Sequence, residues 1–290
     1  MNSSNLITLR VWGDFACFTR PEMKVERVSY PVMTPSAARG ILEAVFWEPQ
    51  MYYLIDSIYV VRRGQWISIR RNEVTKVISL DSAKTWMHSP EKTTPIQAGG
   101  GAEDGTQRNM LALQDVEYLI TAEVRLTPLA KPPRDNLAKY LREIEGRARA
   151  GKCFHRPGLG MREFAADFDW EPDADAALTR RVTELGHPVP QGSEPLGLML
   201  YDLFDHRARA AGFRWLTPDE EARQAADFEL TLVDLKKGEQ TKRRKEFVSQ
   251  RLRSTSAPIK PAPLFFNATL KNGRLDCHPD RVLGPIQGGP

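Results

Sequence analysis

Residues 12–47 of this chain read WGDFACFTRPEMKVERVSYPVMTPSAARGILEAVFW. The stretch begins at the end of a segment, Leu6–Trp12, whose two alternating sets of side chains predict a β-strand. It ends in an apolar segment that predicts a helix from Pro35 to Phe46, because Thr34 is a favoured N-cap residue and Pro35 suits the first helical position. A cationic loop separates the two elements. A strand, a basic loop and an apolar helix in succession are a common way to hold a polyanion.

Further strands are predicted on the carboxyl-terminal side of this unit. Residues 51–61 are rich in aromatic and β-branched side chains and predict a buried strand, and short strands are expected at Trp66–Ile69 and Val74–Ile78. Residues 79–110 lack apolar periodicity, which predicts a long loop or an extended hairpin arm. The clearest alternating strand is Asp115–Thr127.

A second helix is predicted over Leu137–Ala150, where apolar residues recur at spacings of three and four. Either Asp135 or Asn136 can cap its start, and Gly151 is well placed to end it. The segment Cys153–Phe168 then predicts a glycine-containing turn that enters a fourth core strand. The order strand, helix, strand, arm, strand, helix, strand is that of a ferredoxin-like βαββαβ domain.

The predicted fold class is therefore α+β, with a ferredoxin-like (RRM-like) domain, a long arm and a small C-terminal antiparallel β-sheet. We expect four parts: the ferredoxin-like domain at 1–170 with its arm at about 79–110, a linker at 171–194 with a short helix at Ala174–Leu185, a small antiparallel β domain at 195–282, and a tail at 283–290. Strands of the β domain are expected at Gly197–Phe204, Phe213–Leu216, Phe228–Leu235 and Pro263–Leu270.

Charge is sorted along the chain although the formal net charge is only +4. Arg62–Lys76 holds five cations and one anion, Arg134–Lys152 holds six and three, and Lys236–Arg253 holds eight and two. Such runs give local positive faces of the kind that phosphate binding needs. An ordinary solvated surface is the alternative for any single run, and it is less favoured for three.

The remaining composition excludes several classes of protein. Cys17, Cys153 and Cys277 are isolated, which predicts neither a disulfide framework nor a zinc site. We expect no metal and no cofactor. Residues 1–10 lack the features of a signal peptide, and no apolar run reaches the roughly 18 residues of a membrane span. A cytoplasmic protein without membrane association is expected.

Landmarks in the same order along nearly the whole chain resemble one known family. They are the stretches at 12–33 and 34–47, RRNEV at 70–74, QDVEYLI at 114–120, RARAGKCF at 147–154, LGMREF at 159–164 and LGLMLYDLFD at 196–205. The chain resembles the Cas-five proteins of type I-C CRISPR systems (subtype c/d, Dvulg type), members of the RAMP superfamily built on RRM-like domains.

The resemblance implies a function. Such a protein binds the repeat-derived 5′ handle of CRISPR RNA and caps one end of the type I-C Cascade surveillance complex. Its implied partners are the Cas-seven backbone subunits, the large Cas-eight subunit and, through the assembled complex, target DNA. Proteins of this subtype also commonly process precursor CRISPR RNA by metal-independent cleavage at the repeat hairpin.

Metal-free RNA cleavage needs groups that move protons and neutralise charge while the 2′-hydroxyl attacks its own phosphate. The best local group is Lys139 and Tyr140 in the second helix. Family members that cut RNA have a lysine followed by a histidine here, and a tyrosine or histidine at the end of the first helix. Lys139 matches this pattern, whereas Tyr140 and Phe46 depart from it. His155 is the nearest alternative imidazole, so the candidate catalytic residues are Lys139, Tyr140 and His155.

Cations near these elements are the candidate RNA-binding residues: Arg20, Lys24, Arg27, Arg39, Arg70, Arg71, Arg108, Arg147 and Arg149. Two functions stay open at this point. The first is a sequence-specific endoribonuclease that remains on its product, and the second is a non-catalytic handle-binding and assembly subunit with a decayed nuclease site. A stand-alone RNA-binding protein is a third. Packing is an alternative role for Tyr140, and core packing is the favoured role for Phe46.

Overall fold

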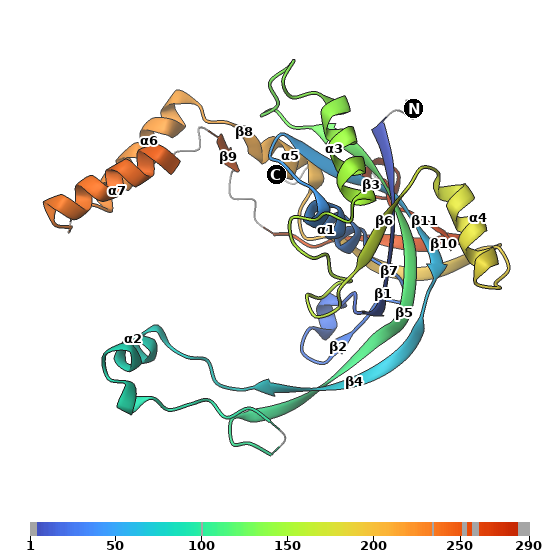
Figure 1. The fold of residues 1–290 in the computed structure, drawn as a ribbon, viewed down its shortest axis with the longest axis horizontal. Helices are drawn as coiled ribbons and strands as arrows, with labels where there is room; N and C mark the ends of the chain where they lie inside the picture. Colours follow the sequence, from blue (N-terminus) through green and yellow to red (C-terminus); the bar gives the residue numbers. More distant parts are fainter. Residues whose placement is uncertain (1–4, 100, 234, 251–253, 257–260, 284–290) are drawn as a thin grey trace.

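The computed structural model describes residues 5–283 except 100, 234, 251–253 and 257–260. A nine-stranded sheet forms its centre, in the order β6-β1-β5-β3-β11-β10-β7, with β2 and β4 also paired to β5 (Figure 1). The strands are β1 (Leu6–Ala16), β2 (Arg27–Val28), β3 (Met51–Arg62), β4 (Gln65–Val74), β5 (Gly105–Leu126), β6 (Asp167–Glu171), β7 (Ser193–Asp202), β8 (Phe213–Trp215), β9 (Ser254–Ser256), β10 (Leu264–Lys271) and β11 (Arg274–Asp276). The helices are α1 (Pro35–Val45), α2 (Leu80–His88), α3 (Leu137–Arg149), α4 (Ala174–Glu184), α5 (His206–Gly212), α6 (Pro218–Leu230), α7 (Lys237–Gln250) and α8 (Pro279–Val282), with short 3₁₀ turns at Pro21–Met23 and Pro90–Lys92.

Strand β5 holds this sheet together because its 22 residues pair with four other strands. Its first half pairs with β4 and β2, and its second half lies between β1 and β3. Between the halves, Asp115 has a φ of 62°, a left-handed conformation that aspartate tolerates better than most residues. Its carboxylate lies 2.7 Å from Arg62 Nη2. Beyond this point β4 and β5 leave the body as a curved two-stranded arm with α2 near its end (Figure 1).

Helices cover both faces of the sheet. Alternation along β5 sends Tyr118 and Ile120 to the face where α1 and α3 pack, and Leu119 to the face where α4 packs. The larger core lies on the α1 and α3 side and includes Ile41 and Ile144, which are no more than 1% exposed. This core fixes the ends of α1 and α3, where the candidate catalytic residues lie.

The starts of these two helices follow from their caps. The Thr34 hydroxyl accepts a hydrogen bond from the Ala37 amide at 3.3 Å, as the sequence predicts. At α3 the cap is Asn136, whose side-chain oxygen accepts from the Lys139 amide at 3.0 Å. Asp135, the other candidate cap, instead accepts from the Lys131 amide.

Most elements predicted for the first 170 residues are confirmed, with two differences in the arm. The strand expected at Trp66–Ile69 is part of a longer strand, β4. The strand expected at Val74–Ile78 is wrong, because β4 ends at Val74, opposite the first residue of its partner β5, and residues 75–79 lie in no helix or strand. The arm also contains α2, which is capped by Ser79, whose hydroxyl accepts a hydrogen bond from the Ser82 amide at 3.0 Å. No residue of α2 is buried, so apolar periodicity gave no signal for it.

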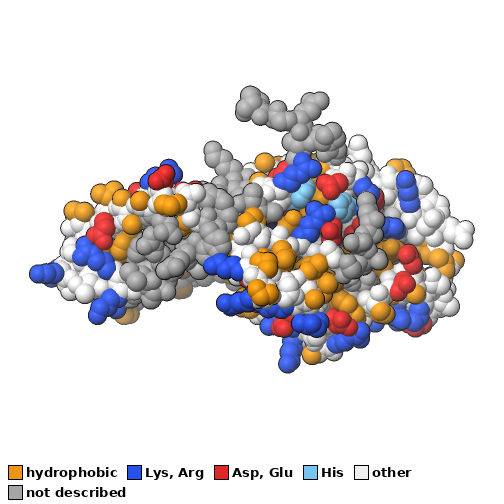
Figure 2. Space-filling view, turned by 90° about the horizontal axis from the view of Figure 1, so that it is seen from above, with side chains coloured by type: hydrophobic (Ala, Val, Ile, Leu, Met, Phe, Trp, Pro, Cys, Tyr) orange, Lys and Arg blue, Asp and Glu red, His pale blue; other side chains and the backbone are white. Residues whose placement is uncertain are grey.

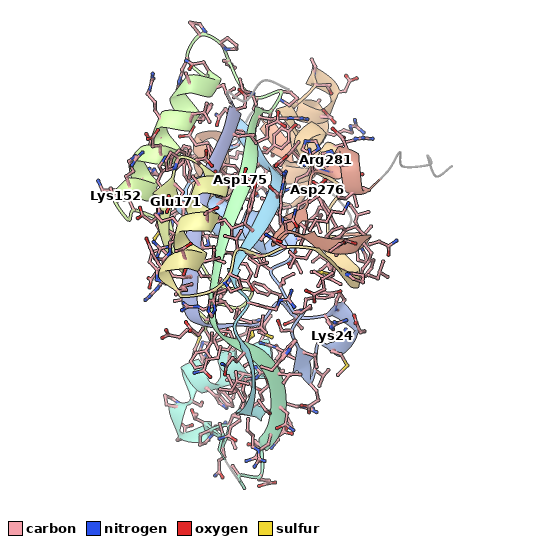
Figure 3. The ribbon with its side chains drawn as sticks, turned by 90° about the vertical axis from the view of Figure 1, so that its right-hand side faces the viewer. Lys24, Lys152, Glu171, Asp175, Asp276 and Arg281 are labelled. Atoms are coloured by element: carbon pink, nitrogen blue, oxygen red, sulfur yellow. The ribbon has the colours of Figure 1, made fainter. Side chains whose placement is uncertain are left out.

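Of the strands expected in the C-terminal part, β7 and β10 extend the main sheet, whereas β8 pairs with β9 in a separate two-stranded sheet. β11 pairs antiparallel with β3, β10 pairs with β11 and β7, and α8 is held by Arg281, whose guanidinium bonds Asp56 at 2.8 Å and Asp276 at 2.6 Å (Figure 3). The strand expected at Phe228–Leu235 is wrong, because α6 covers its start. Thr217 and Glu220 form a capping box that begins this helix.

Two expected segments fall partly or wholly outside the described residues. Residues 284–290 of the expected tail lie outside them, as do residues 251–253 of the basic run that starts at Lys236. The described part of that run is mainly α7. None of the helices in the described part of the chain combines the length and apolarity that a membrane span requires.

A buried carboxylate attaches α4 to the sheet. Glu117 of β5 is 1% exposed and lies 2.9 Å from Arg10 Nε and 2.7 Å from Arg181 Nε of α4. Burial raises the pKa of Glu117, but the hydrogen bond from Arg181 and the charges of Arg10 and Arg181 outweigh burial and hold it below its usual value. A carboxyl group with a lowered folded-state pKa stabilises the fold above its unfolded pKa, and this contribution is lost as the pH falls through the folded pKa.

We expect Glu117→Gln to lower the free energy of unfolding by about 3 kcal/mol at pH 7, because it leaves two partly buried guanidinium groups without their anion. Urea unfolding at pH 7 and at pH 3 measures this. The difference from the parent should shrink at pH 3, because the carboxyl of the unfolded parent takes up a proton there and the lowered pKa of the folded state then stabilises the fold less. Glu163→Gln, at an exposed position, is the matched control. A difference that is the same at both pH values would contradict this account.

The arm contributes little to the stability of the body, since its helix buries no residue. Replacing residues 75–104 by Asn-Gly would join Val74 to Gly105, which are paired across the arm, through a two-residue hairpin turn. We expect a folded protein with a melting temperature within about 3 °C of the parent. Loss of cooperative thermal unfolding would show that the arm belongs to the core.

Candidate functional site

Tyr140 is the centre of a small polar cluster between α1 and α3. Its side chain is fully buried, and its hydroxyl donates to Asp135 Oδ1 at 3.0 Å. Its ring stacks on Phe46, with centroids 6.4 Å apart. The Lys139 ammonium lies 4.8 Å from the centre of the same ring.

These contacts decide what Tyr140 can do. Burial, followed by the hydrogen bond to Asp135 and that residue's charge, raises the pKa of Tyr140 well above its usual value. The hydroxyl therefore stays protonated, and its proton is held by an internal carboxylate. Phe46 is 5% exposed and belongs to the same core. This position favours packing for both residues and disfavours the proton-transfer role considered for Tyr140.

Lys139 lies at the rim of this cluster. Its side chain is 37% exposed, and its ammonium is 3.5 Å from Asp135 Oδ1 and 3.8 Å from Glu48 Oε2. Partly exposed pairs of this kind contribute little to stability. The ammonium is therefore available to a phosphate that approaches the start of α3.

His155 lies at the other end of α3, in the segment that follows the helix. The amides of Phe154 and His155 both donate to the carbonyl of Ala44, at 2.8 and 3.3 Å, and so satisfy a carbonyl in the last turn of α1. The 13 residues of α3 span about 20 Å. Among the contacts of the described residues, none joins His155 to Lys139.

A groove opens beside His155, which we call the α1–loop groove. It encloses about 700 Å³ and is lined on one side by α1 and on the other by the loop that follows α3. The lining residues are Ala37, Gly40, Ala44, Phe154, His155, Arg156, Gly158, Gly160, Met161 and Arg162. The loop passes close to β1's end at Gly160, where a Cβ would lie 2.2 Å from the Cys17 carbonyl oxygen. Gly160 also has a φ of +84°, so this position requires glycine.

The candidate RNA-binding cations form two groups. At the base of the arm, Arg27 Nη1 lies 3.3 Å from the Met161 sulfur, Arg71 pairs with Glu73 at 2.7 Å, and Arg108 lies 3.7 Å from Glu26. Arg20 covers the Tyr30 ring, with 4.6 Å between its guanidinium carbon and the ring centre, and Lys24 and Arg70 are exposed. Met161 thus connects this group to the α1–loop groove.

The second group is on α3. Arg147 pairs with Glu143 at 2.9 Å and lies 5.1 Å from the Phe46 ring centre. Arg149 pairs with Glu145 at 2.8 Å. Helical ion pairs at this spacing are exposed and exchangeable, so a phosphate can compete for either guanidinium.

These groups do not merge into one uniform patch. Figure 2 shows Lys and Arg side chains interspersed with Asp and Glu on the face it presents. Figure 3 shows Lys24 and Lys152 on opposite sides of the molecule. The α1–loop groove lies between the cations at the base of the arm, which reach it at Met161, and the loop that follows α3.

Arg39 differs from the other candidates because its side chain is only 17% exposed. Its guanidinium donates to Asp202 of β7 and to Glu43 of α1, each at 2.8 Å, and Arg209 of α5 also bonds Glu43. This cluster ties α1 to the C-terminal strands. The geometry favours a structural role for Arg39.

Sequence reasoning did not single out four residues that line the α1–loop groove: Gly40, Phe154, Arg156 and Arg162. The segment 153–162 carried a signal, since an aromatic residue and two arginines flank two glycines there. Gly40 gave none, because a glycine inside a helix pattern does not reveal which face it occupies.

The chain matches the family described as CRISPR-associated protein (Cas_Cas5) over residues 6–244. It belongs to this family. A relative from Mannheimia succiniciproducens, named CRISPR pre-crRNA endoribonuclease Cas5d, is 41% identical over 207 residues, which cover 70% of this chain and 87% of the relative. One of the same name from Thermus thermophilus is 42% identical over 200 residues, covering 68% and 72%.

A solved structure described as a CRISPR-associated protein resembles this family member in fold. Its TM-score is 0.50 with 17% sequence identity, over 94% of this chain and 91% of the other. The likeness supports an α+β architecture built on a large antiparallel sheet.

We expect Arg39→Ala to lower the free energy of unfolding by about 3 kcal/mol, because it leaves two partly buried carboxylates with one fewer cation. Affinity for RNA, measured with protein that is still folded, should stay within twofold of the parent. Arg142→Ala, at an exposed position of α3, is the control for stability. An unchanged stability together with weakened RNA binding would return Arg39 to the RNA-binding set.

Proposed function

We propose that this chain binds CRISPR RNA and processes its precursor as a metal-independent endoribonuclease that cuts at the repeat hairpin. The observation that carries the proposal is its membership of the family, with 41% and 42% identity to two relatives named as pre-crRNA endoribonucleases. The exposed His155, which is followed by Arg156, and the partly exposed ammonium of Lys139 support the same function.

The chemistry needs no group beyond RNA and protein side chains. The 2′-oxygen forms a bond to the adjacent phosphorus, the bond to the 5′-oxygen breaks, and one proton is removed while another is delivered to the leaving oxygen. We propose that Lys139 neutralises charge on the phosphate, as an ammonium does at transferring phosphoryl groups. Tyr140 packs behind it, and its hydroxyl and the Lys139 ammonium both contact Asp135. His155 is an exposed imidazole that lies apart from Lys139, and its proposed role is proton transfer or RNA binding at the groove.

The proposed domain organisation and partners are those expected for this function. The sheet order β6-β1-β5-β3, with α1 and α3 as crossovers, supports a ferredoxin-like domain at about 1–170 with the arm at 79–110. We propose residues 171–194 as its linker, of which α4 packs back on the sheet, and 195–282 as a second unit joined through β11. The proposed partners are the Cas-seven and Cas-eight subunits of the type I-C surveillance complex and, through it, target DNA.

A second candidate function is RNA binding without cleavage. Two specific observations favour it: Phe46 has no proton to transfer, and the hydroxyl of Tyr140 is buried against Asp135. In that case the chain holds the 5′ handle and serves assembly alone.

Incubating the protein with its cognate repeat RNA in EDTA separates the two functions. We expect one discrete cut, slowed at least about 100-fold in Lys139→Ala because a charge contact to the phosphate is lost. Tyr140→Phe should keep the cut, since its hydroxyl faces Asp135, and His155→Ala reports on the imidazole. Tight binding of the repeat with no cut over hours would contradict the nuclease and leave the binding subunit. No preference for the repeat over an unrelated hairpin would contradict both.

A further inference from the structure

The α1 wall of the α1–loop groove is made of the smallest side chains. Ala37, Gly40 and Ala44 recur at spacings of three and four, so they share one face of the helix. A Cβ built at Gly40 meets no atom within 4 Å. The space above this face is therefore open, and nothing in the fold of the described residues needs a glycine there.

The opposite wall presents an aromatic ring to solvent. The Phe154 side chain is 84% exposed, although its backbone is fixed by the 2.8 Å hydrogen bond to Ala44. The His155 ring lies edge-on to it, with centroids 5.9 Å apart. A large exposed apolar ring on an anchored backbone is a feature of stacking platforms in single-stranded nucleic acid sites.

The charged residues that line the groove are arginines. Its lining, as far as the structure describes it, contains Arg156 and Arg162 and no aspartate or glutamate. Arg156 lies 3.8 Å from Asp167 with both side chains exposed, and Arg162 has no ion pair among the described residues. Arg27 adds a cation at Met161. The exposed ring can stack on a planar base, and the arginines can bind phosphates. A nucleotide therefore fits this arrangement better than an acidic or apolar peptide does.

We propose that the α1–loop groove takes one unpaired nucleobase of a single-stranded RNA segment, stacked on Phe154, with the neighbouring phosphates bound by Arg156 and Arg162. This inference rests on the proposed function, because its ligand is RNA. It adds that the bound part is an unpaired base and that Phe154, Arg156 and Arg162 receive it. The volume of about 700 Å³ lies within the range of roughly 300–1,000 Å³ that small-molecule sites occupy. Small residues on α1 keep this space open for the base.

Gly40 allows a test in which stability and binding move in opposite directions. Leucine is a far better helix former than glycine, and the open space accepts its side chain. Gly40→Leu should therefore unfold at the same or a higher temperature than the parent while its side chain fills the groove. Gly146→Leu is the matched control, because Gly146 is also helical, also has no atom within 4 Å of a built Cβ, and does not line the groove.

The measurement is the fluorescence anisotropy of the full chain with a labelled single-stranded RNA from the repeat, and with the same sequence fully paired. We expect Phe154→Ala and Gly40→Leu to weaken single-strand binding by about tenfold and to leave duplex binding within twofold, with Gly146→Leu like the parent. An abasic substitution in the RNA at the bound position should remove the difference between Phe154→Ala and the parent.

Three outcomes would overturn the inference. Unchanged single-strand affinity in Gly40→Leu would show that no base enters the groove, and a loss only of subunit assembly would assign the groove to a protein. Equal losses on single strand and duplex would show that only backbone binds. If the parent cuts the repeat and Gly40→Leu binds it normally, this inference fails and the proposed function stands. If the parent ignores the repeat but Gly40→Leu still weakens single-strand binding, the proposed function fails and the groove stands.

Discussion

The pairing of β5 with its neighbours is the constraint on which the other parts of this structure depend. This one strand pairs with β4 in the arm and with both β1 and β3 in the body. In its second half, Tyr118 and Ile120 are buried in the core on the α1 and α3 side, whereas Leu119 packs with α4 and Glu117 pairs with Arg181 of that helix. Because side chains alternate, a shift of register by one residue would send the whole apolar set to the wrong face. The positions of α1, α3 and the groove between α1 and its loop follow from this register.

Electrostatics then divides the cations into two kinds. Arg10, Arg39, Arg181 and Arg281 are bound to carboxylates at short distances and hold elements together. Lys139, Arg156 and Arg162 have long or no ion pairs and remain open to a ligand. A buried pair is costly to break because one charge is left unpaired, whereas an exposed pair exchanges its partner at little cost. A near-neutral protein can therefore bind a polyanion at a few places without an extended basic face.

The fold was largely predictable from the sequence, and the site was predictable only in part. The strands 6–12, 51–61 and 115–127 and the helices near 35–46 and 137–150 were found because their apolar periodicity and caps are strong local signals. Helix α2 was missed because it buries nothing, and the strand expected at 228–235 failed because a capping box and a helical environment overrode the local β preference. Lys139 lies on the helix predicted for it, and its role in cleavage stays a prediction. That Tyr140 is buried against Asp135 depends on how α3 meets Phe46, which local sequence does not specify.

The sequence alone determined the identity and order of the core elements, the landmarks of the family and the positions of the basic residues, since each is a local property of neighbouring side chains. Only the tertiary structure decided which of those cations are committed to internal carboxylates and which remain free. It also decided that β7, β10 and β11 continue the first sheet and that Gly40 faces an open groove opposite Phe154. Most of these are relations between residues distant in the sequence or on opposite walls of a cavity, and they exist only after burial of the core has fixed where each helix and loop lies.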